Sequence, residues 1–179
     1  MYEEVIHWRA HLDLQAYLDG NKLVAHNGIG FDYPLLRQIW GVQIRKQQAI
    51  DTLIMSRLLN PVIEGGHSLK AWGKRLGVEK LEFDVTDFDA GYTTEMATYC
   101  ERDVYLLEKL HKHLETEFSY WPDSGTKPLE LEHEVAIILS RMERTGFKLD
   151  VDRVQAMDIE TVGEMDDIES EMQAIFPPI

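Results

Sequence analysis

Apolar residues recur along this chain at spacings that divide it into short strands and longer helices. The compact run Leu23-Val24-Ala25 predicts a buried strand. A polar, Gly-containing turn follows, and a helix is expected to open near Pro34 and to end at Trp40-Gly41. A second strand is expected to end at Ala49-Ile50, and Asp51-Thr52 begins the next helix. This alternation of strands and helices predicts an α/β fold.

Shorter patterns flank this centre. Glu4 to Trp8 is a strand candidate, and a brief helix is expected from Asp13 to Leu18. Ser68 is a good N-cap for another short helix, which Gly77 closes. Residues 78 to 91 are expected to form an irregular loop.

Three longer helices are expected in the second half of the chain. The first begins after Thr93 or Thr94 and carries an apolar stripe rich in leucine. The second spans Leu129 to Thr145, and the third, after Asp150, carries a Met-rich stripe that is typical of a core or a helix-packing surface. Five side chains of the second helix are expected to face inward: Leu131, Val135, Ile138, Leu139 and Met142.

The net charge of the chain argues against nucleic-acid binding less strongly than its total value suggests. The formal net charge is -14, whereas nucleic-acid binders neutralise phosphates with Lys and Arg. From Asp123 onward the chain holds 14 acidic and 5 basic residues, against 18 and 13 from Met1 to Pro122. Six basic residues of the first part could form a rim around an acidic site or belong to an ordinary solvated face, and both interpretations stay open. They are Arg37, Arg45, Lys46, Lys70, Lys74 and Arg75.

Other features of the composition indicate the compartment. The single cysteine, Cys100, excludes an intramolecular disulfide framework and fits a reducing cytosol. We find no basic leader with an apolar segment at the N-terminus, and no apolar run approaches the length of about 20 residues that a membrane span needs. A cytoplasmic protein without a membrane partner is therefore expected.

Two carboxylates stand at strand-to-helix corners. Asp32 follows the first strand, and in a parallel sheet the carboxyl ends of the strands are where functional groups gather. Asp32 is thus a candidate functional residue, although an Asp there could also cap the helix. Asp51 repeats the pattern, but no further acidic or Gly signal accompanies it, and the N-cap role is favoured.

A third carboxylate lies within the long helix. Tyr99 and Asp103 are four residues apart and therefore share one face of that helix. If Asp103 lies on the apolar stripe, it needs a partner, a hydrogen-bond network or a metal. An Asp at the edge of the stripe with a structural hydrogen bond is equally open.

Two motifs together resemble the DEDD 3′–5′ exonucleases. The segment His26-Asn27-Gly28-Ile29-Gly30-Phe31-Asp32 resembles their second motif, and Tyr99-Cys100-Glu101-Arg102-Asp103 matches the third motif of the tyrosine subclass. The segment His67 to Gly77 looks like the proofreading domain of bacteriophage family A DNA polymerases. The stretch Glu132 to Asp150 is similar to the helix and turn that lead into their polymerase domain.

The resemblance implies a fold and a division of the chain. Residues 1–122 would form a partial 3′–5′ exonuclease domain with a ribonuclease H-like fold. Residues 123–179 would form a helical connector that leads toward a polymerase domain. The implied partner is the 3′ end of single-stranded DNA, and the implied cofactor is a pair of Mg²⁺ or Mn²⁺ ions.

The resemblance also implies roles for five residues. Asp103 would contact a metal ion directly, and Asp32 would take an outer or bridging position. Tyr99 would place the attacking water. Asn27 and Phe31 would support the site or the terminal nucleotide.

The first motif of the family is missing from its expected place. Asp-x-Glu should precede Asn21, and residues 1–20 contain no such pair. Asp158-Ile159-Glu160 has the letters but lies in the acidic tail helix. We therefore expect a chain that begins after the first strands and is weak or inactive alone. An upstream segment or a separate polypeptide would supply the missing strand, and a polymerase domain would follow downstream.

Two other kinds of function stay open. One is a non-catalytic structural or DNA-holding module of a replication polymerase. The other is an RNA-trimming DEDD exonuclease, which the polymerase-like tail does not support.

Overall fold

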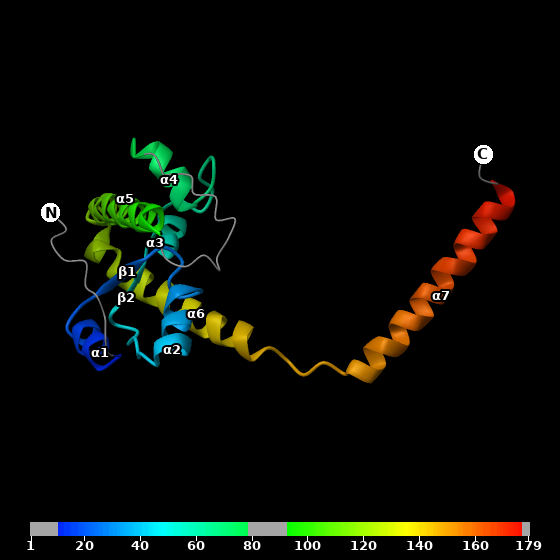
Figure 1. Ribbon diagram of the computed structural model, residues 1–179. Helices are drawn as coiled ribbons and strands as arrows, with labels where there is room; N and C mark the ends of the chain where they lie inside the picture. Colours follow the sequence, from blue (N-terminus) through cyan, green and yellow to red (C-terminus); the bar gives the residue numbers. More distant parts are fainter. Residues whose placement is uncertain (1–10, 79–92, 177–179) are drawn as a thin grey trace. The chain divides into compact units, whose positions relative to one another are not determined.

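The computed structural model describes residues 11–78 and 93–176 (Figure 1). The predicted strand from Glu4 to Trp8 and nearly all of the predicted loop 78–91 lie outside these ranges. The contacts divide the chain into two units, Met1–Met142 and Glu143–Ile179. The division at 122/123, which rests on the resemblance, stays a prediction.

Two short parallel strands form the sheet of the first unit. β1 (Leu23–Ala25) pairs with β2 (Ala49–Asp51) so that Val24 lies opposite Ile50. The predicted α/β class is confirmed to the extent of this small sheet among mostly helical elements. β1 is half-buried and not buried as predicted. Within the described residues it has a neighbouring strand on one side only.

The helices between and after the strands begin where local signals place them. α2 (Asp32–Trp40) starts two residues before the predicted Pro34. Its C-cap is Gly41, whose φ of 66° suits a residue without a Cβ. α3 (Thr52–Leu59), α4 (Leu69–Arg75) and α5 (Thr94–Phe118) follow. Their N-caps are Asp51, Ser68 and Thr93, as expected. The cap side chains accept the backbone N–H groups of Leu53, Ala71 and Met96 respectively.

The main core joins α3, α4 and α5. Met55, Trp72, Leu110, Leu114 and Phe118 form one buried cluster, which confirms the apolar stripe of the long helix. A smaller cluster lies beside α1 (His11–Asp19), where Leu14 and Leu18 pack with Val42. α5 also contacts β1, and Figure 1 shows the green helix beside the blue strand. This contact brings the long helix to the sheet.

The helices of the acidic tail differ from the prediction. A 3-10 turn (Pro122–Gly125) leads into α6 (Thr126–Thr145). The five side chains expected to face inward are exposed: Leu131, Val135, Ile138, Leu139 and Met142. The inward prediction is wrong because α6 buries His133 and Ser140 instead.

The second unit contains α7 (Val151–Ile175), which buries none of its residues. Its predicted stripe is present as a line of exposed apolar side chains that includes Met157, Met165 and Met172. Among the described residues, no helix is both long and apolar enough to cross a membrane.

Candidate active site

The predicted second motif forms a tight turn between β1 and α2. We call residues His26–Asp32 the site loop. Asn27 has a φ of 70°, in the left-handed region that Asn tolerates better than most residues. The Phe31 N–H donates to Asn27 O at 3.0 Å, and the Tyr33 N–H donates to Gly28 O at 2.8 Å. The chain therefore reverses direction within a few residues and delivers Asp32 to the start of α2.

Asp51 holds this loop from the neighbouring strand. Its Oδ1 atom accepts the N–H groups of Asn27 at 2.9 Å and Leu53 at 3.0 Å, and its Oδ2 atom accepts the Ile29 N–H at 3.1 Å. The side chain is almost completely buried. A buried carboxylate is stable when several N–H groups bind it, as here. Asp51 is thus structural and caps α3, as predicted, but it also anchors the site loop.

Two further side chains reach the same region from α6. His133 Nε2 accepts the Asp51 N–H at 2.8 Å, so its ring proton sits on Nδ1, which donates to Leu129 O at 2.8 Å. Ser140 Oγ donates to Ile29 O at 2.9 Å. Both side chains are buried. We did not predict these contacts, since the sequence signals only that both are polar residues on an amphipathic helix.

The tyrosine Tyr33 closes the base of the site loop. Its hydroxyl donates to Leu23 O at 2.8 Å and lies 3.3 Å from Ile50 O, one residue on each strand. Burial, together with the negative charges of Asp51 and Asp32, raises the pKa of Tyr33 well above its usual value. The phenol therefore stays protonated and serves as a donor.

The predicted site residues of the loop are open to solvent. Asn27, Phe31 and Asp32 are all exposed. Asp32 occupies the first position of α2, and the N-cap is Phe31, which makes no side-chain cap bond. Burial raises the pKa of Asp32, and the nearby charge of Asp51 adds to this rise; its own N–H and His26 oppose it. Asp32 is therefore a carboxylate whose negative charge is not fully offset by its surroundings.

The other two predicted residues lie on α5. Tyr99 and Asp103 are both half-buried, one helical turn apart on the same face. The Oδ1 atom of Asp103 is shielded from solvent. Because α5 contacts β1, the structure brings the helix of the third motif to the strand that leads into the second. These contacts are between elements and establish no bond between Asp32 and Asp103.

The donor chemistry of these residues fits a hard cation in part. Mg²⁺ and Mn²⁺ prefer oxygen ligands, and Mg²⁺ often takes one or two carboxylates together with substrate phosphates. Asp32 and Asp103 are such donors. In the described ranges, however, no group of three or more His, Cys, Asp or Glu side chains could hold a metal ion. The two carboxylates therefore form at most an incomplete ligand set by themselves.

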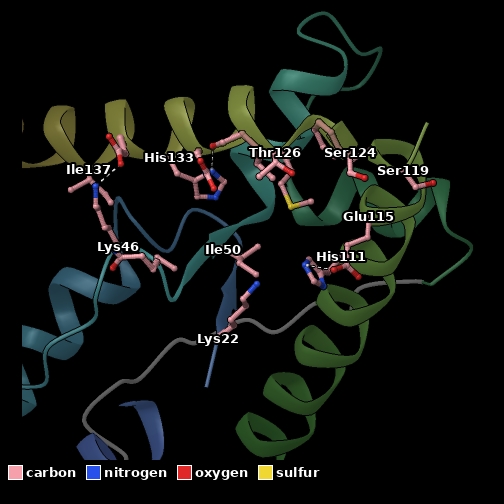
Figure 2. Close-up of a pocket in the computed structure, with 17 residues that line it drawn as sticks. Lys22, Lys46, Ile50, His111, Glu115, Ser119, Ser124, Thr126, His133 and Ile137 are labelled. Carbon is pink, nitrogen blue, oxygen red and sulfur yellow. Dashed lines mark hydrogen bonds and ion pairs between the residues drawn. The ribbon is translucent and has the colours of Figure 1, made fainter. Parts of the chain in front are cut away.

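A separate pocket of about 660 Å³ lies beside β2. Figure 2 shows His111 and Glu115 projecting toward it from α5, and His133 and Ile137 from α6. None of the five predicted site residues lines it. Several of its polar groups are already engaged: His111 lies 3.6 Å from Glu115, and Lys46 pairs with Glu134 at 2.5 Å. No sequence pattern predicted this pocket.

Three of the six candidate basic residues make local contacts within the fold. Arg45 pairs with Asp19 at 2.9 Å, and Lys46 pairs with Glu134. Arg75 stacks over the Trp72 ring at 4.9 Å and donates to Gly66 O at 2.7 Å. At least these three cations have local structural partners.

Comparison with the sequences of known proteins finds similarity to DNA polymerases. The chain is 27% identical to a DNA-directed DNA polymerase of Escherichia phage T7. The alignment is 226 positions long and covers 92% of this chain and 32% of that protein. It is similar to phage DNA polymerases. A DNA-directed DNA polymerase of Enterobacteria phage T3 is 29% identical over 83% of this chain and 30% of its own length.

The likeness to polymerases extends to a second type. A PolC-type DNA polymerase III of Ureaplasma parvum is 32% identical over 56% of this chain and 6% of its own length. No protein-family model matches the chain. The chain spans about a third of the length of the two phage polymerases. It is thus similar to DNA polymerases over a segment much shorter than those proteins.

Proposed function

We propose that the chain is the 3′–5′ exonuclease portion of a phage-type family A DNA polymerase and acts on the 3′ end of single-stranded DNA in the cytoplasm. The observation that carries the proposal is the likeness to two phage DNA polymerases over 92% and 83% of the chain. A range of 92% is long enough to include both the site loop and the Tyr99–Asp103 segment. The patterns of both motifs support the exonuclease assignment. The ribonuclease H-like fold and the tyrosine subclass belong to the same proposal.

The roles of the residues follow from their positions. Asp32 and Asp103 would hold a divalent ion, which supplies polarisation of the phosphate and a more acidic bound water. The Tyr99 hydroxyl would orient the attacking water from the same face of α5 as Asp103. The exposed Phe31 ring can stack on the terminal base, and Asn27 offers an amide beside it.

The proposal includes a dependence on another segment. Two carboxylates form an incomplete clamp for two ions, and the third and fourth would come from an Asp-x-Glu strand. We therefore propose little or no cleavage by the 179 residues alone and efficient cleavage once a polypeptide with that strand is supplied.

Digestion of 3′-labelled single-stranded DNA tests this function. The chain is incubated with Mg²⁺ or Mn²⁺, alone and together with a polypeptide that carries an Asp-x-Glu strand. We expect release of labelled nucleotide only in the second case, and at least about a 100-fold loss in Asp103→Ala. Asp158→Ala on α7 is the matched control and should leave the rate unchanged.

The other outcomes separate the alternatives. Robust cleavage by the chain alone that Asp103→Ala abolishes overturns the dependence on a second segment. No metal-dependent cleavage after the strand is supplied favours a DNA-holding module. Faster cleavage of RNA than of DNA of the same sequence favours an RNA-trimming exonuclease.

A further inference from the structure

The site loop is held by its backbone from two directions. On the β2 side, the Asp51 carboxylate accepts the N–H groups of Asn27 and Ile29. On the α6 side, Ser140 Oγ donates to Ile29 O at 2.9 Å. Ile29 is therefore fixed through both its N–H and its C=O, and it is also buried. Asp32 follows only three residues later, so a shift of the Ile29 backbone changes where that carboxylate points.

The anchor Asp51 is itself held from α6. Its N–H donates to His133 Nε2 at 2.8 Å, and the imidazole is fixed in turn by its bond to Leu129 O. His133 and Ser140 are seven residues apart, so they lie on one face of the helix two turns from each other. One helix face thus reaches both the loop and the residue that anchors the loop.

We infer that His133 and Ser140 are positioning residues, which fix the site loop from α6 and thereby set the direction of the Asp32 carboxylate for metal binding. Neither side chain belongs to the predicted second or third motif, and their bonds described above reach Asp51 and Ile29. They act through the backbone of Asp51 and Ile29. This inference rests on the proposed function for its metal-binding consequence, whereas the fixing of the loop can be measured without it.

Two pairs of variants separate hydrogen bonding from simple packing. His133→Leu removes the nitrogen that accepts the Asp51 N–H, and His133→Gln retains an acceptor. Ser140→Ala removes the hydroxyl, and Ser140→Thr retains it. Ile138→Ala is the control on the same helix, since that side chain is 56% exposed.

Two measurements on the full chain decide the inference. The first is hydrogen exchange of the Asn27, Ile29 and Asp51 amides by NMR. The second is Mn²⁺ affinity by electron paramagnetic resonance, with Asp103→Ala as the variant that should lose the ion. We expect His133→Leu and Ser140→Ala to speed exchange of these amides and to weaken Mn²⁺ binding about tenfold, as outer partners of metal ligands do. His133→Gln and Ser140→Thr should restore both properties in large part.

Each result has one meaning. Unchanged exchange and unchanged Mn²⁺ affinity in both Ser140→Ala and His133→Leu overturn the inference. Faster exchange with unchanged affinity overturns the link to Asp32. If the unmodified chain binds no Mn²⁺, the proposed metal site of this chain fails, and the exchange rates alone decide whether α6 fixes the loop. If His133→Leu does not fold, the Ser140 pair gives the same decision.

Discussion

The two strand-to-helix corners of the first unit look alike in sequence and differ in structure. β1 leads to Asp32, and β2 leads to Asp51. Asp51 is 1% exposed and accepts three backbone N–H groups. Asp32 is open to solvent, and partial desolvation of its carboxylate, together with the charge of Asp51, raises its pKa. The same residue type therefore serves as an anchor at one corner and as an available charge at the other. This division suits a site in which one carboxylate holds the backbone and another is left for a ligand.

Replacing the anchor should have the largest effect. Asp51→Ala leaves the N–H groups of Asn27, Ile29 and Leu53 without their acceptor in a buried place. Each such group costs about 1 to 3 kcal/mol, and we expect the free energy of unfolding to fall by about 3 to 5 kcal/mol. Urea denaturation followed by tryptophan fluorescence measures the change.

The matched variant is Asp32→Ala at the other corner. It should change the free energy of unfolding by less than about 0.5 kcal/mol, because the side chain is exposed. Equal losses for the two variants would remove the distinction between anchor and available charge. Asp51→Asn, which keeps one acceptor oxygen, should fall between them and serves if the alanine variant does not fold.

A glycine substitution tests how tightly the first corner is packed. A Cβ at Gly28 would overlap the Ala25 side chain and lie 2.9 Å from the Tyr33 ring. Gly28→Ala should lower the free energy of unfolding by about 1 to 3 kcal/mol, because the strand and the ring that closes the loop would have to move. Gly20→Ala is the control, since the nearest atom to its Cβ is 3.9 Å away. A harmless Gly28→Ala would show that the site loop is not close-packed.

The smallest expected effect concerns the pH dependence of Asp32. Its pKa is raised above the ordinary 3.8 in the folded chain, so the fold binds the proton more tightly than the unfolded chain does. Stability should therefore decrease as the pH rises from 3.8 through the folded value. Solvent screening of this exposed group keeps the effect below about 0.5 kcal/mol.

Comparison of Asp32→Asn with the unmodified chain isolates this dependence. Above the folded pKa the asparagine variant should be slightly more stable, and below pH 3.8 the two should converge. Urea midpoints across this range give the difference. A variant that is less stable at neutral pH would mean that the charge of Asp32 has a favourable partner in the fold.

Local signals in the sequence predicted much of the fold. The N-caps Asp51, Ser68 and Thr93 were each predicted from a polar side chain just before a helical pattern of apolar residues. Their cap hydrogen bonds reach backbone N–H groups two or three residues further along the chain. The leucine stripe of α5 was predicted for the same reason, since its spacing alone defines one face. These features need no knowledge of distant parts of the chain.

Contacts between distant residues could not be predicted in this way. The bond from Asp51 to His133 joins residues 82 apart, and that from Ser140 to Ile29 joins residues 111 apart. Periodicity showed that α6 has an apolar face but not which face packs on the rest of the first unit. The buried face is the one that carries His133 and Ser140. The same limit applies to the candidate site. Its residues were named from motifs, and their roles in metal and DNA binding stay predictions.

Three of the exposed apolar side chains on α7, those of Val154, Met165 and Met172, lie in one straight line along the helix. From Val154 to Met165 the line advances eleven residues, and from Met165 to Met172 it advances seven. Eleven residues drift slightly one way around an α-helix and seven drift slightly the other way, and their sum of 18 is about five whole turns. The two drifts cancel, so the line needs no supercoil to stay on one side. The three side chains therefore stay on one side of α7 over about five turns, without any bend in the helix.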